Sequence, residues 1–127
     1  MQIRKFNSSS VAAPIGGYCQ VCEVSGAQRM VFVSGQIPQP LTGEVPQDFD
    51  AQCRLAWRNV EAQLATVDMT LANLVKVTTY LSDRKYRVAS RAIRAEVLGN
   101  NEPALTVIVA GIMDEKWLLE IEAVAMA

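Results

Sequence analysis

The 127-residue sequence contains no histidine, the commonest general base and metal ligand in proteins. Any catalysis must therefore run on carboxylates, hydroxyls, thiols, lysine, arginine, backbone groups or water, and we expect no metal and no cofactor. The sequence also lacks a window of the roughly 18 apolar residues that a membrane span requires, and Met1–Ser10 lacks the apolar core of a signal peptide. We therefore expect a cytoplasmic protein with no membrane partner.

A strong charge of either sign is also missing, because 12 basic and 13 acidic side chains give a formal net charge of −1. No overall field attracts nucleic acid, so nucleic-acid partners are not expected. Cysteine is scarce and odd in number, with Cys19 and Cys22 in a C-x-x-C arrangement and Cys53 apart from them. On a strand, residues i and i+3 point to opposite faces, which disfavours a disulfide or a shared metal. We interpret the cysteines as small buried apolar residues.

The first half of the chain predicts a hairpin followed by a helix. Residues 18–24 and 30–34 read as two strands joined by a polar turn at 25–28, and a proline-rich loop follows. Asp48 is a plausible N-cap for a helix that reaches about residue 67. Its predicted core stripe is Phe49, Cys53, Ala56, Trp57, Val60, Leu64 and Val67, and its predicted solvent side is Gln52, Arg54, Arg58, Glu61 and Gln63.

The alternating, β-branched residues 74–81 predict another strand, and a second helix should run from Ser82–Asp83 to about Leu98, with Gly99 as its stop. The predicted apolar side of this helix is Val88, Ala89, Ala92, Ile93 and Val97. Its other side carries a basic row, Arg84, Arg87, Arg91 and Arg94. We interpret the row as solvated or salt-bridged; binding of a phosphate or carboxylate and a subunit contact are the alternatives.

The last quarter contains two strand-like runs, 103–110 and 117–125, separated by a polar turn at 114–116. The second run carries Glu120 and Glu122 at positions i and i+2, so the two carboxylates share one face of their strand. Such a pair is solvated, paired across a subunit boundary, or part of a site.

These elements predict a single α+β domain over residues 1–127, with two helices on one face of a mixed sheet and a further short strand at 4–6. Nothing in the chain covers the other face of that sheet, although it carries apolar residues. Another copy of the same chain is the expected cover, so we expect a homo-oligomer.

Four segments together carry a family resemblance: residues 13–18 (Ala-Pro-Ile-Gly-Gly-Tyr), 34–38 (Ser-Gly-Gln-Ile-Pro), 103–106 (Pro-Ala-Leu-Thr) and 120–125 (Glu-Ile-Glu-Ala-Val-Ala). In order and spacing the chain resembles the Rid family (reactive intermediate deaminase, YjgF-type, also labelled L-PSP endoribonuclease). The resemblance implies a chorismate-mutase-like protomer and a homotrimer whose sheets pack at the centre, with small-molecule clefts between subunits.

The resemblance also implies roles for particular residues. Glu120 falls at the position of the glutamate that positions water, which makes it the candidate catalytic residue. Apart from the resemblance, we interpret Glu122 as a structural partner. The implied substrate-binding residues are Tyr18, Ser34, Ser90, Leu105 and Thr106. The family arginine that grips the substrate carboxylate is Leu105 here, which cannot make a bidentate, charge-assisted contact. Ser90 stands at a common asparagine position, and Val107 replaces the family cysteine.

Three functions remain open at this point. The first is hydrolytic deamination of an imine or enamine that lacks an α-carboxylate or carries it elsewhere, with Arg91 or Arg94 replacing the lost anchor if the helix turns its basic side to the cleft. The second is a non-catalytic small-molecule-binding or regulatory trimer. The third, a ribonuclease, is disfavoured by the neutral charge, the lack of histidine and the few aromatic residues.

Overall fold

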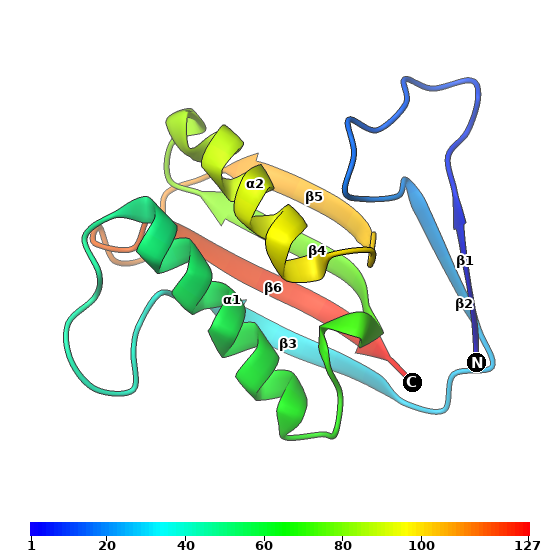
Figure 1. The fold of residues 1–127 in the computed structure, drawn as a ribbon, viewed down its shortest axis with the longest axis horizontal. Helices are drawn as coiled ribbons and strands as arrows, with labels where there is room; N and C mark the ends of the chain where they lie inside the picture. The colour runs from blue at the N-terminus through cyan, green and yellow to red at the C-terminus, as the bar shows by residue number, and fades with distance from the viewer.

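Two sheets of unequal size and two helices make up the fold, and the computed structural model describes all residues from 1 to 127 (Figure 1). The strands and helices, in chain order, are β1 (Gln2–Phe6), β2 (Val21–Ser25), β3 (Met30–Gln36), α1 (Phe49–Ala65), β4 (Leu74–Leu81), α2 (Arg87–Leu98), β5 (Ala104–Val109) and β6 (Leu119–Met126). Short 3₁₀ turns, Leu71–Asn73 and Arg84–Tyr86, precede β4 and α2.

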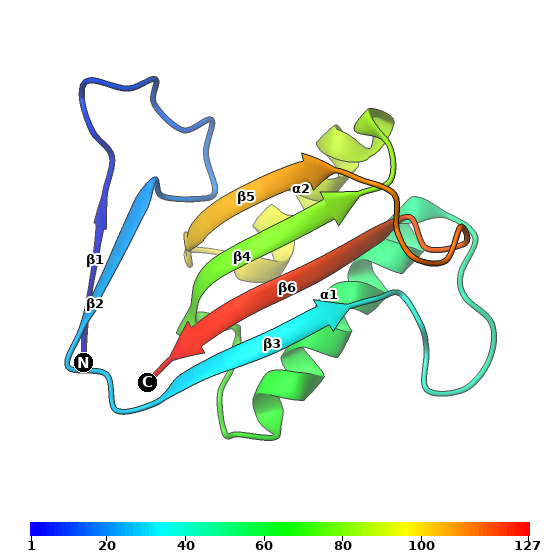
Figure 2. The same ribbon diagram turned by 180° about the vertical axis from the view of Figure 1, so that it is seen from behind.

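The main sheet has the strand order β3-β6-β4-β5. β6 is antiparallel to both of its neighbours, whereas β4 and β5 are parallel. Both helices lie on one face, and Figure 2 shows the other face with no element of the chain in front of it. The predicted α+β architecture, a mixed sheet with two helices on one face, is confirmed.

The predicted hairpin between residues 18–24 and 30–34 is wrong. β2 pairs with β1 to form a separate two-stranded ribbon, and β3 pairs with β6. The predicted start at Tyr18 is also too early, because β2 begins at Val21. The residues between β2 and β3 lead the chain to the main sheet, where the N–H groups of Gln28 and Arg29 donate to the carbonyl oxygen of Ala127 at 2.8 and 2.9 Å. Because β3 pairs with β6, Val33 of β3 lies in the main core, whereas no residue of β2 does.

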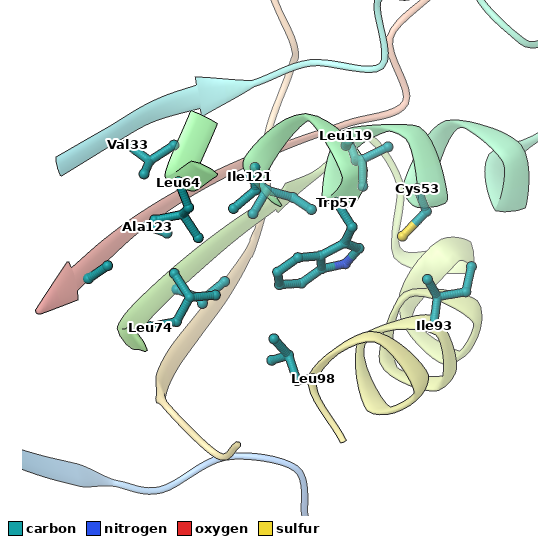
Figure 3. Close-up of a cluster of buried hydrophobic side chains, with 14 of the residues drawn as sticks. Val33, Cys53, Trp57, Leu64, Leu74, Ile93, Leu98, Leu119, Ile121 and Ala123 are labelled. Carbon is teal, nitrogen blue, oxygen red and sulfur yellow. The ribbon is translucent and has the colours of Figure 1, made fainter. Parts of the chain in front are cut away.

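The core lies between the sheet and the helices (Figure 3). Asp48 caps α1 as predicted, since its carboxylate accepts from the Ala51 N–H at 3.1 Å. The predicted stripe of α1 is buried except for Val67, which lies beyond the helix end and is half-buried. Neither helix has the length and apolar character needed to cross a membrane.

Gln52 was predicted on the solvent side of α1 but is only 1% exposed. Its amide nitrogen donates to the carbonyl oxygens of Pro46 and Lys116, at 2.7 and 2.8 Å. Its amide oxygen accepts from the Leu118 N–H at 2.8 Å. These three hydrogen bonds compensate burial of the amide and join α1 to the loops at both sides.

The second helix is rotated relative to the prediction. Val88 is 67% exposed and Ala92 is exposed as well, whereas Ser90, Ile93, Arg94 and Leu98 are buried. The buried set follows helical spacing and faces α1 and the sheet. The prediction failed because it placed only apolar residues on the buried side, and two of the buried positions here are polar.

Candidate functional site

A pocket of about 420 Å³ lies between α2 and the β5 edge of the main sheet. The loop that leads into β2 covers part of it. Its lining residues are Ile15, Tyr18, Gln20, Leu81, Arg84, Arg87, Ser90, Arg91, Arg94, Leu105, Val107 and Val109. Three predicted substrate-binding residues, Tyr18, Ser90 and Leu105, therefore lie together in this pocket.

The sheet wall of the pocket is apolar. Leu105 and Val107 on β5 stand opposite Val77 and Thr79 of β4, both of which are buried beneath the helices. Directly paired residues of neighbouring strands project to the same face, so Leu105 and Val107 also point to the helix face. At this position the wall offers a ligand van der Waals contact and no charge.

The helix wall of the pocket is basic. Arg84 and Arg87 are exposed, Arg91 is half-buried and Arg94 is only 5% exposed. The two ion pairs of the chain, Arg4–Glu23 and Arg54–Glu96, use none of them, and no acidic side chain lines the pocket. The predicted solvated or salt-bridged row is thus wrong for Arg94, which is buried without an ion-pair partner. Burial, together with the neighbouring Arg91, lowers the pKa of Arg94 below its usual range.

The loop above the pocket is shaped by two consecutive glycines. Gly16 and Gly17 have φ angles of 135° and 76°, which side chains rarely permit. A Cβ atom at Gly17 would lie 3.9 Å from Nη2 of Arg94, so the backbone passes directly beside the guanidinium. Beyond Tyr18, the Cys19 N–H donates to the carbonyl oxygen of Pro103 at 3.2 Å and ties the loop to β5. The sequence Gly-Gly-Tyr therefore brings Tyr18 to the pocket.

Glu120 lies on the other face of the sheet. It stands opposite Tyr80 of β4, and Tyr80 stands opposite Ile108 of β5, all on the face without helices. The carboxylate reaches across to β3, because a Cβ atom at Gly35 would lie only 2.5 Å from Oε2 of Glu120. Glu120 and Leu105, which the family resemblance assigns to one cleft, thus face opposite sides of the sheet within one chain.

The other predicted residues also lie on this open face. The Tyr80 hydroxyl donates to Oε1 of Glu122 at 2.5 Å, and this hydrogen bond raises the pKa of Tyr80. Lys76 Nζ donates to Oγ1 of Thr106 at 2.6 Å, and burial lowers the pKa of Lys76, although Glu122 opposes that shift. Ser34 lines a shallower hollow of about 360 Å³, together with Lys76 and Glu122.

The predicted burial of the cysteines is confirmed for Cys19 and Cys53 but is wrong for Cys22, which is half-buried. All three are free thiols, and burial raises the pKa of Cys19 and raises that of Cys53 to about 12. Cys19 and Cys22 do not lie on one strand as predicted, because Cys19 precedes β2, and Cys22 contributes to raising the pKa of Cys19. No group of three or more His, Cys, Asp or Glu side chains is placed to hold a metal ion.

The chain is similar in sequence to proteins of a known family. The profile of the family described as Endoribonuclease L-PSP matches residues 9–127. A RutC family protein of Pyrococcus horikoshii is 34% identical, with 88% of each chain covered. One from Haemophilus influenzae is 32% identical over 99% of this chain and 98% of its own.

Solved structures agree with these sequence matches. YyfB of Yersinia pestis, a Rid family protein, superimposes with a TM-score of 0.88 at 25% identity, over the full length of both chains. TdcF of Escherichia coli, solved with bound serine, gives a TM-score of 0.69 at 27% identity, with 98% of each chain covered.

Proposed function

This chain belongs to the Rid (YjgF/RutC) family, and we propose that it is a hydrolytic deaminase of a small imine or enamine, acting in a cleft between subunits. The observation that carries the proposal is the placement of Leu105 and Glu120 on opposite faces of one sheet. A ligand in the pocket beside Leu105 can meet a water-positioning carboxylate only if Glu120 comes from a second copy of the chain.

The open sheet face supports such an assembly. It carries large exposed apolar side chains, with Phe32 at 74%, Met30 at 54% and Ile108 at 46% exposure. Monomeric proteins rarely leave such side chains gathered on a sheet face. We propose a cytoplasmic homotrimer whose open faces pack at the centre, so that each pocket lies next to a neighbouring subunit.

The proposed reaction needs no group beyond these side chains and water. Glu120 accepts a proton from water as the oxygen attacks the carbon of the C=N bond, and it then passes this proton to the nitrogen. The resulting carbinolamine expels ammonia and leaves a carbonyl product. An enamine first takes a proton on carbon to become the imine. Tyr18 and Ser90 are the proposed hydrogen-bonding partners of the substrate, and Ser34 and Thr106 belong to the open-face side of the cleft.

A non-catalytic, ligand-binding trimer is the second candidate. One observation favours it: no carboxylate, lysine or cysteine lines the pocket beside Leu105, so within one chain the pocket has no carboxylate to position water. The bound serine in TdcF supports small-molecule binding by either kind of protein.

The test is an assay of ammonia release from a panel of imines generated in situ from amines and amino acids. Glu120→Gln should abolish release while the trimer, measured by light scattering, survives; undiminished release would exclude the catalytic role. Leu105→Arg provides a second comparison. Gain of 2-imino acid hydrolysis in this variant would support an intact water site, and no turnover in either protein would favour the binding trimer.

A further inference from the structure

Four arginines line one wall of the pocket in a graded series. Arg84 and Arg87 lie exposed, Arg91 lies half-buried, and Arg94 lies deepest at 5% exposure. The spacing of three, four and three residues puts them on one side of the Arg84–Tyr86 turn and α2. Positive charge is thus continuous along the helix wall from solvent to the buried end of the row.

Arg94 has no partner of its own within the chain. The arginine side chains that donate hydrogen bonds are Arg4, Arg29 and Arg54, and the ion pairs involve Arg4 and Arg54. A buried guanidinium without an anion is costly, and such groups are normally paired. The Gly17 backbone lies beside its Nη2 atom and supplies no negative charge. The nitrogen atoms of Arg94 are not fully enclosed, because the only buried side-chain nitrogen without a partner is Nε1 of Trp117, so the donors of Arg94 open into the pocket, where an acceptor can reach them.

The wall opposite α2 is apolar, so the two walls of the pocket differ in chemistry. Leu81, Leu105, Val107 and Val109 present apolar surface from β4 and β5, and no acidic residue interrupts either wall. A ligand that fits this arrangement has an anionic group against α2 and an apolar or unsaturated body against β5. The volume of about 420 Å³ suits a molecule of metabolite size.

Arg91 and Arg94, the two most buried arginines of the row, determine how much negative charge the anionic group of the ligand should carry. Arg91 and Arg94 are three residues apart on the helix, and their mutual repulsion adds to the desolvation that lowers the pKa of Arg94. A group carrying two negative charges matches two guanidiniums, whereas a single carboxylate leaves one of them uncompensated. Phosphate oxygens and paired carboxylates both suit the forked geometry of arginine.

We propose that Arg94 and Arg91 form a dianion subsite that takes over the anchoring role lost at Leu105. The substrate class is then a small imine or enamine that carries a phosphate group or two carboxylates, held by α2 and not by β5. This substrate assignment rests on the deaminase proposed above, whereas the anion subsite itself can be measured without any reaction.

The binding test uses isothermal titration of the full-length protein with four probes: glycerol 3-phosphate, succinate, acetate and glycerol. We expect the two dianions to bind at least 10-fold more tightly than acetate, and glycerol not to bind. Arg94→Met keeps the length of the side chain and removes its charge, and it should weaken dianion binding about 30-fold or more. Arg58→Met, on the exposed side of α1, is the matched control and should stay within about 2-fold of the parent.

A thermal melt without ligand gives an independent readout. Arg94→Met should melt at or above the parent temperature, because it removes a largely desolvated charge that has no anionic partner in the chain. If that variant does not fold, Arg91→Met serves in its place, with an expected loss of about 10-fold in dianion affinity. Equal affinity for dianions, acetate and glycerol, or unchanged binding in a folded arginine variant, would overturn the subsite.

Turnover separates this inference from the proposed function. Dianion binding that Arg94→Met weakens, without hydrolysis of any imine, would support the subsite and overturn the deaminase. Hydrolysis of imines that carry a phosphate or two carboxylates, at a rate that Arg94→Met leaves unchanged, would do the reverse. If a short RNA oligonucleotide binds more tightly than both dianions and loses affinity in Arg94→Met, the small-molecule assignment is overturned.

Discussion

The carboxylate of Glu120 occupies the space that a side chain at Gly35 would need. A Cβ atom there would lie 2.5 Å from Oε2 and 2.6 Å from Cδ of Glu120. Gly35 has an ordinary φ, so its lack of a side chain matters for the close approach of Glu120 and not for the backbone. The Ser34-Gly35-Gln36 segment thus supports the candidate catalytic group from the neighbouring strand.

Gly35→Ala should lower deamination without unfolding the protein. The atoms that it displaces belong to the end of a flexible side chain, so the melting temperature should change little. A shift of about 1 Å in a reacting group can cost roughly 100-fold in rate. Gly111→Ala, where a Cβ would meet nothing within 4 Å, is the matched control. Adding Gly35→Ala to Glu120→Gln should cause no further loss, and full activity in Gly35→Ala alone would remove the positioning role.

Gln52→Leu should destabilise the protein substantially. The substitution leaves the carbonyl oxygens of Pro46 and Lys116 and the N–H of Leu118 without their partner. The expected loss is about 2–4 kcal/mol in the free energy of unfolding, measured by urea denaturation. Gln63→Leu, at an exposed position of the same helix, should stay within about 0.5 kcal/mol of the parent. A similar loss in both variants would mean that exposure of leucine, and not the buried amide, is responsible.

Tyr80→Phe should change how stability depends on alkaline pH. The hydrogen bond to Glu122 raises the pKa of Tyr80 above its ordinary value of 10.0. A group whose pKa is raised by folding contributes its full stabilisation at pH values below its unfolded pKa. This stabilisation is lost as the pH rises through its folded pKa. The parent should therefore be the more stable protein from pH 7 to 9, and the difference should shrink above pH 10. Tyr86→Phe, whose ring stacks on Phe49, is the control, and a difference that stays constant up to pH 11 would contradict the prediction.

Cys53 should resist thiol reagents until the chain unfolds. Its side chain is 0% exposed, and burial raises its pKa from 9.0 to about 12. The unfolded chain ionises this thiol near pH 9 while the folded chain does not, so stability falls as pH rises, by roughly 1.4 kcal/mol for each pH unit above 9. Cys53→Ala should lose stability less steeply over pH 9 to 11 in urea denaturation. Equal slopes would show that the thiol stays neutral in both states or ionises in both.

Local sequence signals predicted the elements that depend on neighbours in the chain. The Asp48 cap, the core stripe of α1 and the alternation of β4 follow from side chains a few residues apart. Gln52 was missed because its partner Lys116 is 64 residues away. The pairing of β2 with β1 was missed because the turn at 25–28 suggested a local hairpin, while contacts with the far end of the chain decided the outcome.

The structure brings some of the predicted site residues together and separates others. Tyr18, Ser90 and Leu105 meet in one pocket, whereas Ser34, Thr106 and Glu120 face the other side of the sheet. To know which of these residues share a face of the sheet, one needs the register of β4 with both β5 and β6. That register cannot be read from a single sequence. The arginine row was visible as a spacing pattern, but its burial depends on the glycine loop and on β5, which lie elsewhere in the chain.

The loop between β1 and β2, which covers part of the pocket through Ile15, Tyr18 and Gln20, belongs with the β1–β2 ribbon to a unit that can open on its own. The ribbon meets the rest of the fold through the Cys19–Ala104 bridge and the Lys5–Asn101 hydrogen bond of 3.2 Å, while the main core includes no residue of either strand. Small units of this kind open at a lower free energy than the core does. Amide protons of β1 and β2 should therefore exchange with solvent sooner than those of β4 and β6, and ligand residence time should follow this local opening, not global unfolding.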